Sequence, residues 1–193
     1  MAYLWAPPQS RWTDLLNSDS YDHRGSGRRE DCLEVDDWLR TFLELCAYET
    51  ARLPGAAGRA KLRRFRSDMA RLVSAIVAKA EPARRDLETF NRYLRLAAAQ
   101  PRVEVAGERF ELRDVPSSKG LDRVIGYLAR NLAETLAQGE PARIKVCANP
   151  DCHWVVYDES RNRTRRWCEA GACGNLMKVR QFRERQARRG KAP

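Results

Sequence analysis

Four cysteines in the C-terminal quarter of the chain constrain its fold more than any other feature of the sequence. Cys147 and Cys152 form one C-x4-C pair, fifteen residues follow, and Cys168 and Cys173 form a second such pair. A tetrahedral zinc ion takes four soft ligands at about 2.0–2.3 Å, and two short turns that each supply a pair are a common way of providing them. The spacing therefore predicts one structural zinc ion held by these four thiolates.

Other roles for the cysteines fit the pattern less well. A catalytic zinc keeps one coordination position open for water, whereas four thiolates close the shell. The x4 spacing also differs from the x2 spacing of dithiol oxidoreductases. His153 follows a cysteine directly, and on a strand its side chain would point to the opposite face, so we expect a histidine at the surface or beside the ligands. Cys32 and Cys46 lie far from the cluster, and we expect them to be buried among helices.

The residues around the cysteines predict a small zinc finger. Residues 154–157 favour a strand, residues 158–162 a polar turn, and residues 164–168 a returning second strand. Beyond the last cysteine no helix breaker occurs before Gly190, which predicts a helix. We therefore expect a treble-clef-like finger, a β-hairpin followed by a helix, over residues 143–190. Its small core would be aromatic: Trp154, Tyr157, Trp167 and Phe182.

The preceding residues, 1–140, predict a mainly α domain. Prolines and glycines separate four segments in which apolar side chains recur at helical spacing: residues 32–46, 59–79, 83–99 and 119–138. Such segments with short connections indicate an antiparallel helical array.

Between the last two helices the apolar period changes to two. Residues 103–105 and 110–112 alternate, which predicts a β-hairpin that turns at residues 106–108. Ser117 or Ser118 is placed to cap the helix that follows. The glycine- and arginine-rich residues 22–30 have no periodicity and predict a loop.

Positive charge is concentrated around the four cysteines. Residues 143–193 hold 13 Lys/Arg and five Asp/Glu, a net charge of +8, whereas the first 142 residues have a net charge of +2. Such asymmetry indicates a polyanionic partner, usually nucleic acid, although part of the charge can offset the net charge of about −2 of a zinc tetrathiolate centre. Candidate contacts to duplex DNA lie on the hairpin and on the helix: Arg161, Arg163, Arg165, Arg166, Lys178, Arg180, Arg183, Arg185, Arg188 and Arg189.

The motif around the cysteines resembles a known family. From Cys147 onward the chain reads Cys-x4-Cys-x-Trp-Val-Val-Tyr-Asp-x-Ser-Arg-Asn-x-x-Arg-Arg-Trp-Cys-x4-Cys-Gly-Asn, which is similar to the CGNR zinc finger over about residues 143–187. The family tetrad ends in arginine, whereas Leu176 stands at that position here. Residues 12–18, with Trp38 and the leucine after it, resemble more loosely the ABATE-type domain that precedes this finger. The resemblance implies a stress-responsive transcription regulator and brings no enzyme activity with it.

The sequence disfavours several classes of function. No stretch reaches the roughly 18 apolar residues of a membrane span, and the first residues lack the pattern of a signal peptide, so we expect a cytoplasmic protein that does not contact membranes. No glycine-rich phosphate loop, nucleophile elbow or paired metal carboxylates occur, so we do not expect an enzyme. A pocket for a small effector in the N-terminal domain is a further hypothesis, with three candidate residues: Asn17, His23 and Trp38.

These observations lead to one hypothesis and a rival. The first is a cytoplasmic bacterial transcription regulator, whose N-terminal domain senses a signal or associates and whose zinc finger binds duplex DNA. The rival is a zinc-stabilised module that binds a protein surface or RNA without reading a DNA sequence. Neither the oligomeric state nor the target sequence follows from the residues.

Overall fold

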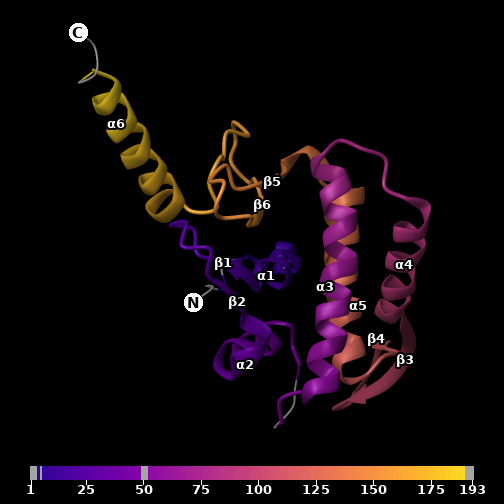
Figure 1. Ribbon diagram of the computed structural model, residues 1–193. Helices are drawn as coiled ribbons and strands as arrows, with labels where there is room; N and C mark the ends of the chain where they lie inside the picture. The colour runs from indigo at the N-terminus through magenta and orange to yellow at the C-terminus, as the bar shows by residue number, and fades with distance from the viewer. Residues whose placement is uncertain (1–3, 5, 49–51, 190–193) are drawn as a thin grey trace.

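The structure, a computed structural model, describes residues 4, 6–48 and 52–189. Three long helices form its centre: α3 (Ala56–Val77), α4 (Arg84–Leu94) and α5 (Gly120–Ala137). Figure 1 shows them side by side, with the shorter α1 (Trp12–Asn17) and α2 (Asp36–Leu45) on the side of α3 away from α4. The predicted mainly α fold is confirmed. Among the helices in the described part of the chain, none has the length and apolar character needed to cross a membrane.

One apolar core lies between these helices. The largest side chains with almost no exposed surface come from α1, α2, α3 and α5: Trp12, Leu15, Phe42, Phe65 and Leu128. Each helix turns one apolar face to this core because its apolar residues recur at helical spacing. Cys32 and Cys46 are buried in the same core, as predicted, and burial raises the pKa of the Cys46 thiol to about 12.

Helix α3 ends in a motif that normally uses glycine. The N–H of Lys79 donates to the carbonyl of Ile76 (3.0 Å), and the N–H of Ala80 donates to the carbonyl of Ala75 (2.9 Å). This pair of hydrogen bonds requires a left-handed residue just after the helix. Lys79 supplies it with a φ of 55° despite its side chain.

Three antiparallel hairpins are attached to the helices. Their strands are β1 (Asp19–Tyr21) with β2 (Arg29–Asp31), β3 (Ala99–Ala106) with β4 (Arg109–Pro116), and β5 (Ile144–Val146) with β6 (Val155–Tyr157). The middle hairpin was predicted, and the other two differ from the prediction. The segment predicted as a loop is the turn of the first hairpin, and strand β2 begins within it.

The predicted serine cap of α5 is wrong, because both serines hold the base of the β3–β4 hairpin. The hydroxyl of Ser118 donates to the carbonyl of Leu96 in a short 3-10 helix, η3 (Arg95–Ala97), at 2.6 Å. The N–H of Ser117 donates to the carbonyl of Ala98 at 2.9 Å. No side chain makes a capping hydrogen bond at the start of α5.

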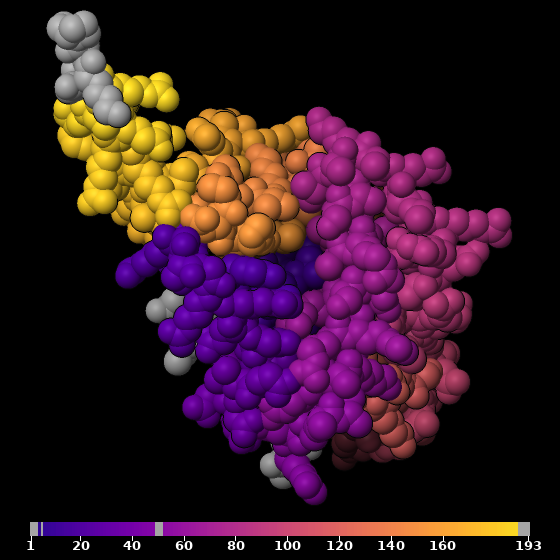
Figure 2. Space-filling model, viewed as in Figure 1, coloured from indigo at the N-terminus to yellow at the C-terminus, as the bar shows by residue number. Residues whose placement is uncertain are grey.

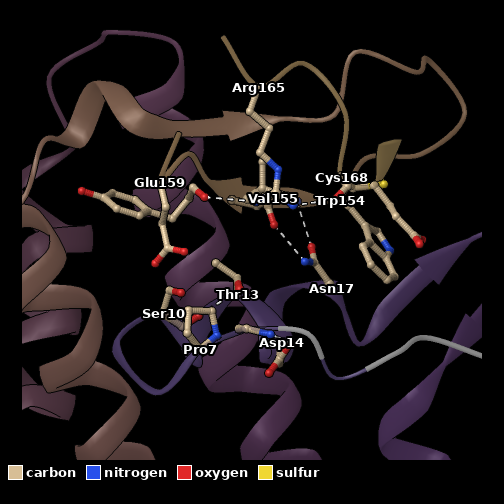
Figure 3. A pocket seen from close by; sticks show the side chains of 14 residues that line it. Pro7, Ser10, Thr13, Asp14, Asn17, Trp154, Val155, Glu159, Arg165 and Cys168 are labelled. Carbon is tan, nitrogen blue, oxygen red and sulfur yellow. Dashed lines mark hydrogen bonds between the residues drawn. The ribbon is translucent and has the colours of Figure 1, made fainter. Parts of the chain in front are cut away.

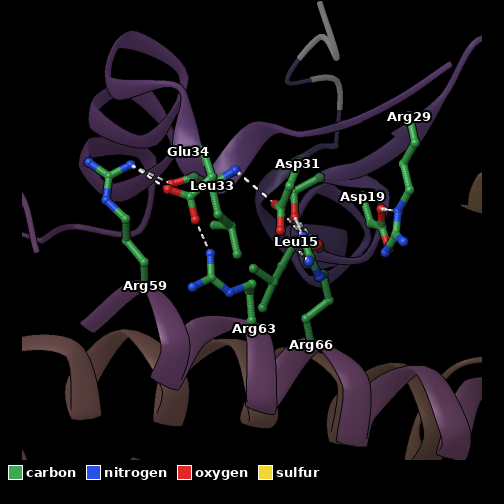
Figure 4. Close-up of polar contacts among 10 residues, drawn as sticks. Leu15, Asp19, Arg29, Asp31, Leu33, Glu34, Arg59, Arg63 and Arg66 are labelled. Atoms are coloured by element: carbon green, nitrogen blue, oxygen red, sulfur yellow. Dashed lines mark hydrogen bonds and ion pairs between the residues drawn. The ribbon is translucent and has the colours of Figure 1, made fainter. Parts of the chain in front are cut away.

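Arginines on one face of α3 hold the β1–β2 hairpin and the 3-10 turn that follows it. Figure 4 shows three of them at spacings of four and three residues, which place them on one side of the helix: Arg59, Arg63 and Arg66. Arg66 donates two hydrogen bonds of 2.7 Å to the carboxylate of Asp31, and Arg63 pairs with Glu34. Burial alone would raise the pKa of Asp31. The hydrogen bonds and the positive charge of Arg66 lower the pKa by a larger amount, so it lies below the usual value.

The finger strands pair differently from the prediction. Residues 155–157 do form a strand, but its partner is residues 144–146 and not residues 164–168. The apolar Ile144 is 3% exposed in the main core, whereas Thr164 and the two arginines after it offer no apolar face to bury. The first cysteine pair therefore lies in the turn of the hairpin, and residues 158–169 form irregular chain around it.

The C-terminal segment packs against the helical body. The side-chain amide of Asn17 donates to the carbonyl of Val155 and accepts from its N–H, both at 2.8 Å. Figure 2 shows this segment seated on the body, with α6 (Asn175–Arg189) projecting from it. The predicted domains, residues 1–140 and 143–190, thus share one core in space, and residue 190 lies outside the described residues.

Candidate metal centre and basic helix

Four thiols meet between the β5–β6 turn and the start of α6. Cys147 and Cys152 lie in that turn, while Cys168 precedes a short π-helical turn, η5 (Ala170–Gly174), and Cys173 lies within it. Their Sγ atoms all lie within 4.8 Å of one another, and those of Cys152 and Cys168 are 3.6 Å apart. Sulfurs bound at 2.3 Å around a tetrahedral zinc are roughly 3.8 Å apart. The four cysteines form a site for one zinc ion, as predicted.

The protonation of the thiols explains why this cluster needs a cation. Hydrogen bonds from the Cys152 and Cys168 thiols lower the pKa of Cys147. The same contact with Cys147 raises the pKa of Cys152. One thiolate is thus stabilised while its neighbours keep their protons. A zinc ion held by the four cysteines would allow all four to ionise with release of those protons, and its closed shell would leave no position for a catalytic water.

A buried asparagine supports the zinc site from within the first cysteine pair. Asn149 is 1% exposed, and its side-chain amide donates to the Sγ of Cys173 (3.3 Å) and to the carbonyl of His23 (2.8 Å). A donor to a ligand sulfur stabilises the thiolate and fixes its orientation. This residue was not predicted from the sequence, although the Asn-Pro-Asp turn inside the C-x4-C pair indicates a tightly turned backbone.

The β1–β2 hairpin contacts the finger at three points, two in its turn and one at the end of strand β1. Besides the carbonyl of His23, the carbonyl of Arg24 accepts a hydrogen bond of 2.8 Å from Arg180 of α6. The ring of Tyr21 meets the ring of His153 edge to face, with 5.0 Å between the centroids. His153 is exposed and lies outside the thiol cluster. The N-terminal part of the chain therefore contacts both the first cysteine pair and the first turns of α6.

A second buried polar residue organises the irregular chain after β6. The carboxylate of Asp158 has no exposed surface and accepts hydrogen bonds from the Lys145 ammonium (2.6 Å) and from the N–H groups of Ser160 (2.9 Å) and Arg165 (3.0 Å). Burial alone would raise the pKa of this carboxyl. The three donors lower it by a larger amount, so the pKa lies well below the usual range. The polar turn predicted at residues 158–162 is thus built around this carboxylate.

The structure uses most of the predicted hairpin cations inside the finger. Arg165 donates to the carbonyl of a zinc-binding cysteine at 2.5 Å, and Arg163 pairs with Glu140 at 2.7 Å. The guanidinium of Arg166 lies 5.1 Å above the ring of the tryptophan after it. Arg161 is exposed and makes no ion pair with the residues that the structure describes. These contacts divide the predicted DNA-binding cations into structural and free ones.

Helix α6 carries the largest group of free cations. Arg180 faces the finger, with its guanidinium 2.7 Å from the carboxylate of Asp151. Leu176, at the position of the family arginine, is half-buried one turn earlier on the same side. The side chain of Arg189 lies outside the described residues. Four cations of this helix are exposed and make no ion pair within the described part of the chain: Lys178, Arg183, Arg185 and Arg188.

The predicted aromatic core of the finger is wrong in two members, because Tyr157 packs against the main core instead of the thiols and Phe182 is exposed. Phe182 is 55% exposed and Val179 is 47% exposed on α6. Figure 1 shows the reason, because α6 projects away from the finger beyond its first turns. Trp167 does pack against the thiols, and Trp154 contacts both the thiols and the main core.

The three residues predicted to line an effector pocket lie apart. Asn17 lines a cavity of about 60 Å³ between α1 and the finger (Figure 3), which has room for a few water molecules. Its amide is already bonded to Val155. Trp38 is 6% exposed and stacks on Phe42 in the main core, while His23 lies in the β1–β2 turn. Neither Trp38 nor His23 lines that cavity.

Comparison with protein families gives two matches. Residues 9–139 match the ABATE family, described as "Putative stress-induced transcription regulator", and residues 143–186 match the CGNR zinc finger. A comparison with curated proteins gives no match. The first family match spans more than half of the chain, and the two matches follow the order that the resemblance implied. The chain therefore belongs to the ABATE family and carries a CGNR zinc finger after its ABATE domain.

Proposed function

We propose that the protein is a transcription regulator that binds duplex DNA through its zinc finger, with α6 as the main contact. One observation carries this proposal: α6 is fixed at its first turns by the zinc site and by Arg180, projects beyond them (Figure 1), and carries four cations that make no ion pair within the described residues. An α-helix fits the major groove of B-form DNA, where cations reach both phosphates and base edges.

The side chains on the outer side of α6 suit such a groove. Lys178, Phe182 and Arg185 follow one another at spacings of four and three residues, so they lie on one side of the helix, opposite Arg180. Arginine and lysine bind guanine edges or phosphates, and an exposed apolar side chain can contact the methyl group of thymine. Arg161 adds a further free cation on the finger loop.

The contacts between the β1–β2 turn and the finger support a regulatory role for the N-terminal domain. A change in this domain, for instance on binding a small effector, would reach the first cysteine pair and α6 through His23 and Arg24. We place this activity in the cytoplasm because thiolate ligands need a reducing compartment. The family description of a stress-induced regulator favours the same role.

The salt dependence of binding tests the proposal. The zinc-loaded full-length chain is titrated into labelled random duplex DNA, and fluorescence anisotropy is followed over a salt series. If about five cations neutralise phosphates, the log–log slope of affinity against salt is roughly −4.5. Lys178→Gln with Arg185→Gln should make the slope less steep, roughly −2.5, and weaken binding about tenfold at about 100 mM salt.

A matched pair separates contact from overall charge. Arg40→Gln with Arg123→Gln removes the same charge from exposed, unpaired positions on α2 and α5, and it should change affinity less than twofold. Single-stranded RNA and heparin are titrated in parallel. Equal affinity for all three polyanions, or no binding to duplex DNA at about 50 mM salt, would favour the rival, a zinc-stabilised interaction module.

A further inference from the structure

The β3–β4 hairpin carries an apolar face with no partner among the described residues. The register pairs Val103 with Leu112 and Val105 with Phe110, so all four side chains lie on one face. They are 62%, 73%, 71% and 79% exposed, respectively. These are the four most exposed large apolar side chains in the described part of the molecule.

The hairpin is long enough that its own stability requires an explanation. It extends over eight residues in each strand, and Ser117 and Ser118 tie its base to the body. A two-stranded hairpin alone is marginally stable in water, and a ribbon of this kind normally gains stability by covering its apolar face. The body does not provide that cover, because nearly every residue of both strands is exposed.

We propose that the apolar face of the β3–β4 hairpin packs against the same face of a second copy of this chain and forms a two-fold symmetric dimer. An isologous interface needs a self-complementary surface. The alternation of the strands provides one, because the charged side chains between residues 102 and 113 lie on the opposite face or in the turn, and Asp114, the one charge on the apolar side, lies opposite Pro101 near the base of the hairpin. Two such faces can therefore meet without burying a charge from this stretch.

The exposed area supplies roughly two-thirds of what a small specific interface needs. Four large apolar side chains at these exposures present roughly 400 Å² per copy, or roughly 800 Å² per pair. Ala99 and Pro101 lie on the same face and add to this area. A specific interface buries about 1,200 Å² in total, so the hairpins supply most of a small, reversible interface.

Charge also favours a second copy at this place. The chain has a formal net charge of +10, so two copies repel one another over most of their surface. Residues 99–116 hold three arginines and four acidic residues, a net charge of −1, which makes the hairpin a site of low repulsion. The hairpin and α6 lie at opposite ends of the molecule in Figure 1, so the dimer leaves both basic helices free.

Sedimentation velocity of the zinc-loaded full-length chain tests this proposal. The weight-average mass should rise from one chain (22.2 kDa) toward two between about 1 and 100 µM, as expected for a small interface. Val105→Thr with Phe110→Thr keeps β-forming residues but makes the face polar, and it should leave a monomer over the whole range. The matched control, Arg102→Thr with Glu104→Thr, alters the opposite face without changing net charge and should dimerise like the wild type.

A second measurement does not depend on the folding of any variant. Hydrogen exchange of wild-type residues 99–116 should slow at least several-fold between the lowest and highest concentrations, while α6 keeps the same exchange rate. A wild-type chain that stays monomeric at about 100 µM overturns the proposal, whether or not the face binds lipid vesicles or another protein. Equal dimerisation of the wild type and the Val105/Phe110 variant also overturns it, because the contact then lies elsewhere.

Discussion

The helical body and the zinc finger are stabilised in different ways within one chain. The body buries many large apolar side chains in one core, among them Trp12, Phe42 and Phe65. The buried cluster of the finger consists of three cysteines, with two tryptophans and the fourth cysteine packed against it. Below a certain size a segment cannot bury enough apolar surface to fold alone, and bound metal supplies the missing free energy.

Buried polar interactions contribute differently to the stability of the two regions. In the body, polar pairs such as Arg66 with Asp31 join elements that the core already holds together. In the finger, Asn149 and Asp158 organise the chain directly around the thiols, where little apolar surface is buried. We therefore expect single changes to act locally in the finger and globally in the body.

Removal of zinc should have the largest effect. Replacing Cys173 with serine leaves three thiolates, and structural zinc sites contribute on the order of 10 kcal/mol to the folding of their segment. Zinc content should fall from one ion per chain to near zero, and amide exchange should become fast over residues 147–153 and 158–189. Exchange measured by mass spectrometry, with zinc determined on the same sample, checks both expectations.

The contact between finger and body should keep part of the finger folded after zinc is lost. Ile144 is buried in the main core and Asn17 clamps Val155, so we expect β5 and β6 to stay protected after zinc is lost. Chelation of zinc from the wild type should reproduce the result of the substitution. Loss of protection in α3 and α5 as well would show that the two regions fold as one unit.

A substitution in the core of the body should destabilise the body and leave zinc binding intact. Phe65 of α3 has no exposed surface and packs at the centre of the core. Phe65→Ala should lower the free energy of unfolding by about 3–5 kcal/mol because it leaves a cavity. Urea unfolding followed by circular dichroism measures this loss, while zinc content should remain one ion per folded chain. A fall in zinc content under native conditions would contradict the separation of the two regions.

Elements that are determined by residues close together in the sequence could be predicted, whereas elements that depend on distant residues could not. The thiol ligands and the long helices were predicted because spacing and periodicity are properties of short segments. The β1–β2 hairpin was not, because its strands are polar and are held by arginines of α3 that lie far along the chain. The strand pairing of the finger depended on Ile144 entering the core of the body. The exposure of Phe182 depended on the direction of α6, which the ion pair of Arg180 with Asp151 helps to set.

The buried ion pair of the body predicts a pH-dependent effect of intermediate size. Asp31 has a lowered pKa in the folded chain, so its ionised form stabilises the fold above its unfolded pKa of about 3.9, and this contribution is lost as the pH falls. Asp31→Asn should cost about 2 kcal/mol at pH 7, because Arg66 is left half-paired in a buried position, and clearly less at about pH 3. The control Asp19→Asn removes the exposed pair with Arg29 and should cost less than about 1 kcal/mol. Urea unfolding at both pH values checks the sign, and a larger effect at the lower pH would contradict it.

The smallest effect is expected at Lys79, at the end of α3. A substitution there tests whether relief of backbone strain in the body leaves the finger unchanged. Lys79 ends α3 with a φ of 55°, a conformation that disfavours any residue with a Cβ atom. Lys79→Gly should therefore raise the free energy of unfolding of the body by about 0.5–1 kcal/mol, net of the extra freedom of glycine in the unfolded chain. Lys79→Ala removes the same charge but keeps the Cβ atom, so it should give no such gain. Urea unfolding of the three proteins measures the difference, and hydrogen exchange over residues 147–189 should be the same in all of them. Equal stability of the glycine and alanine variants would show that the left-handed turn carries no strain that glycine relieves.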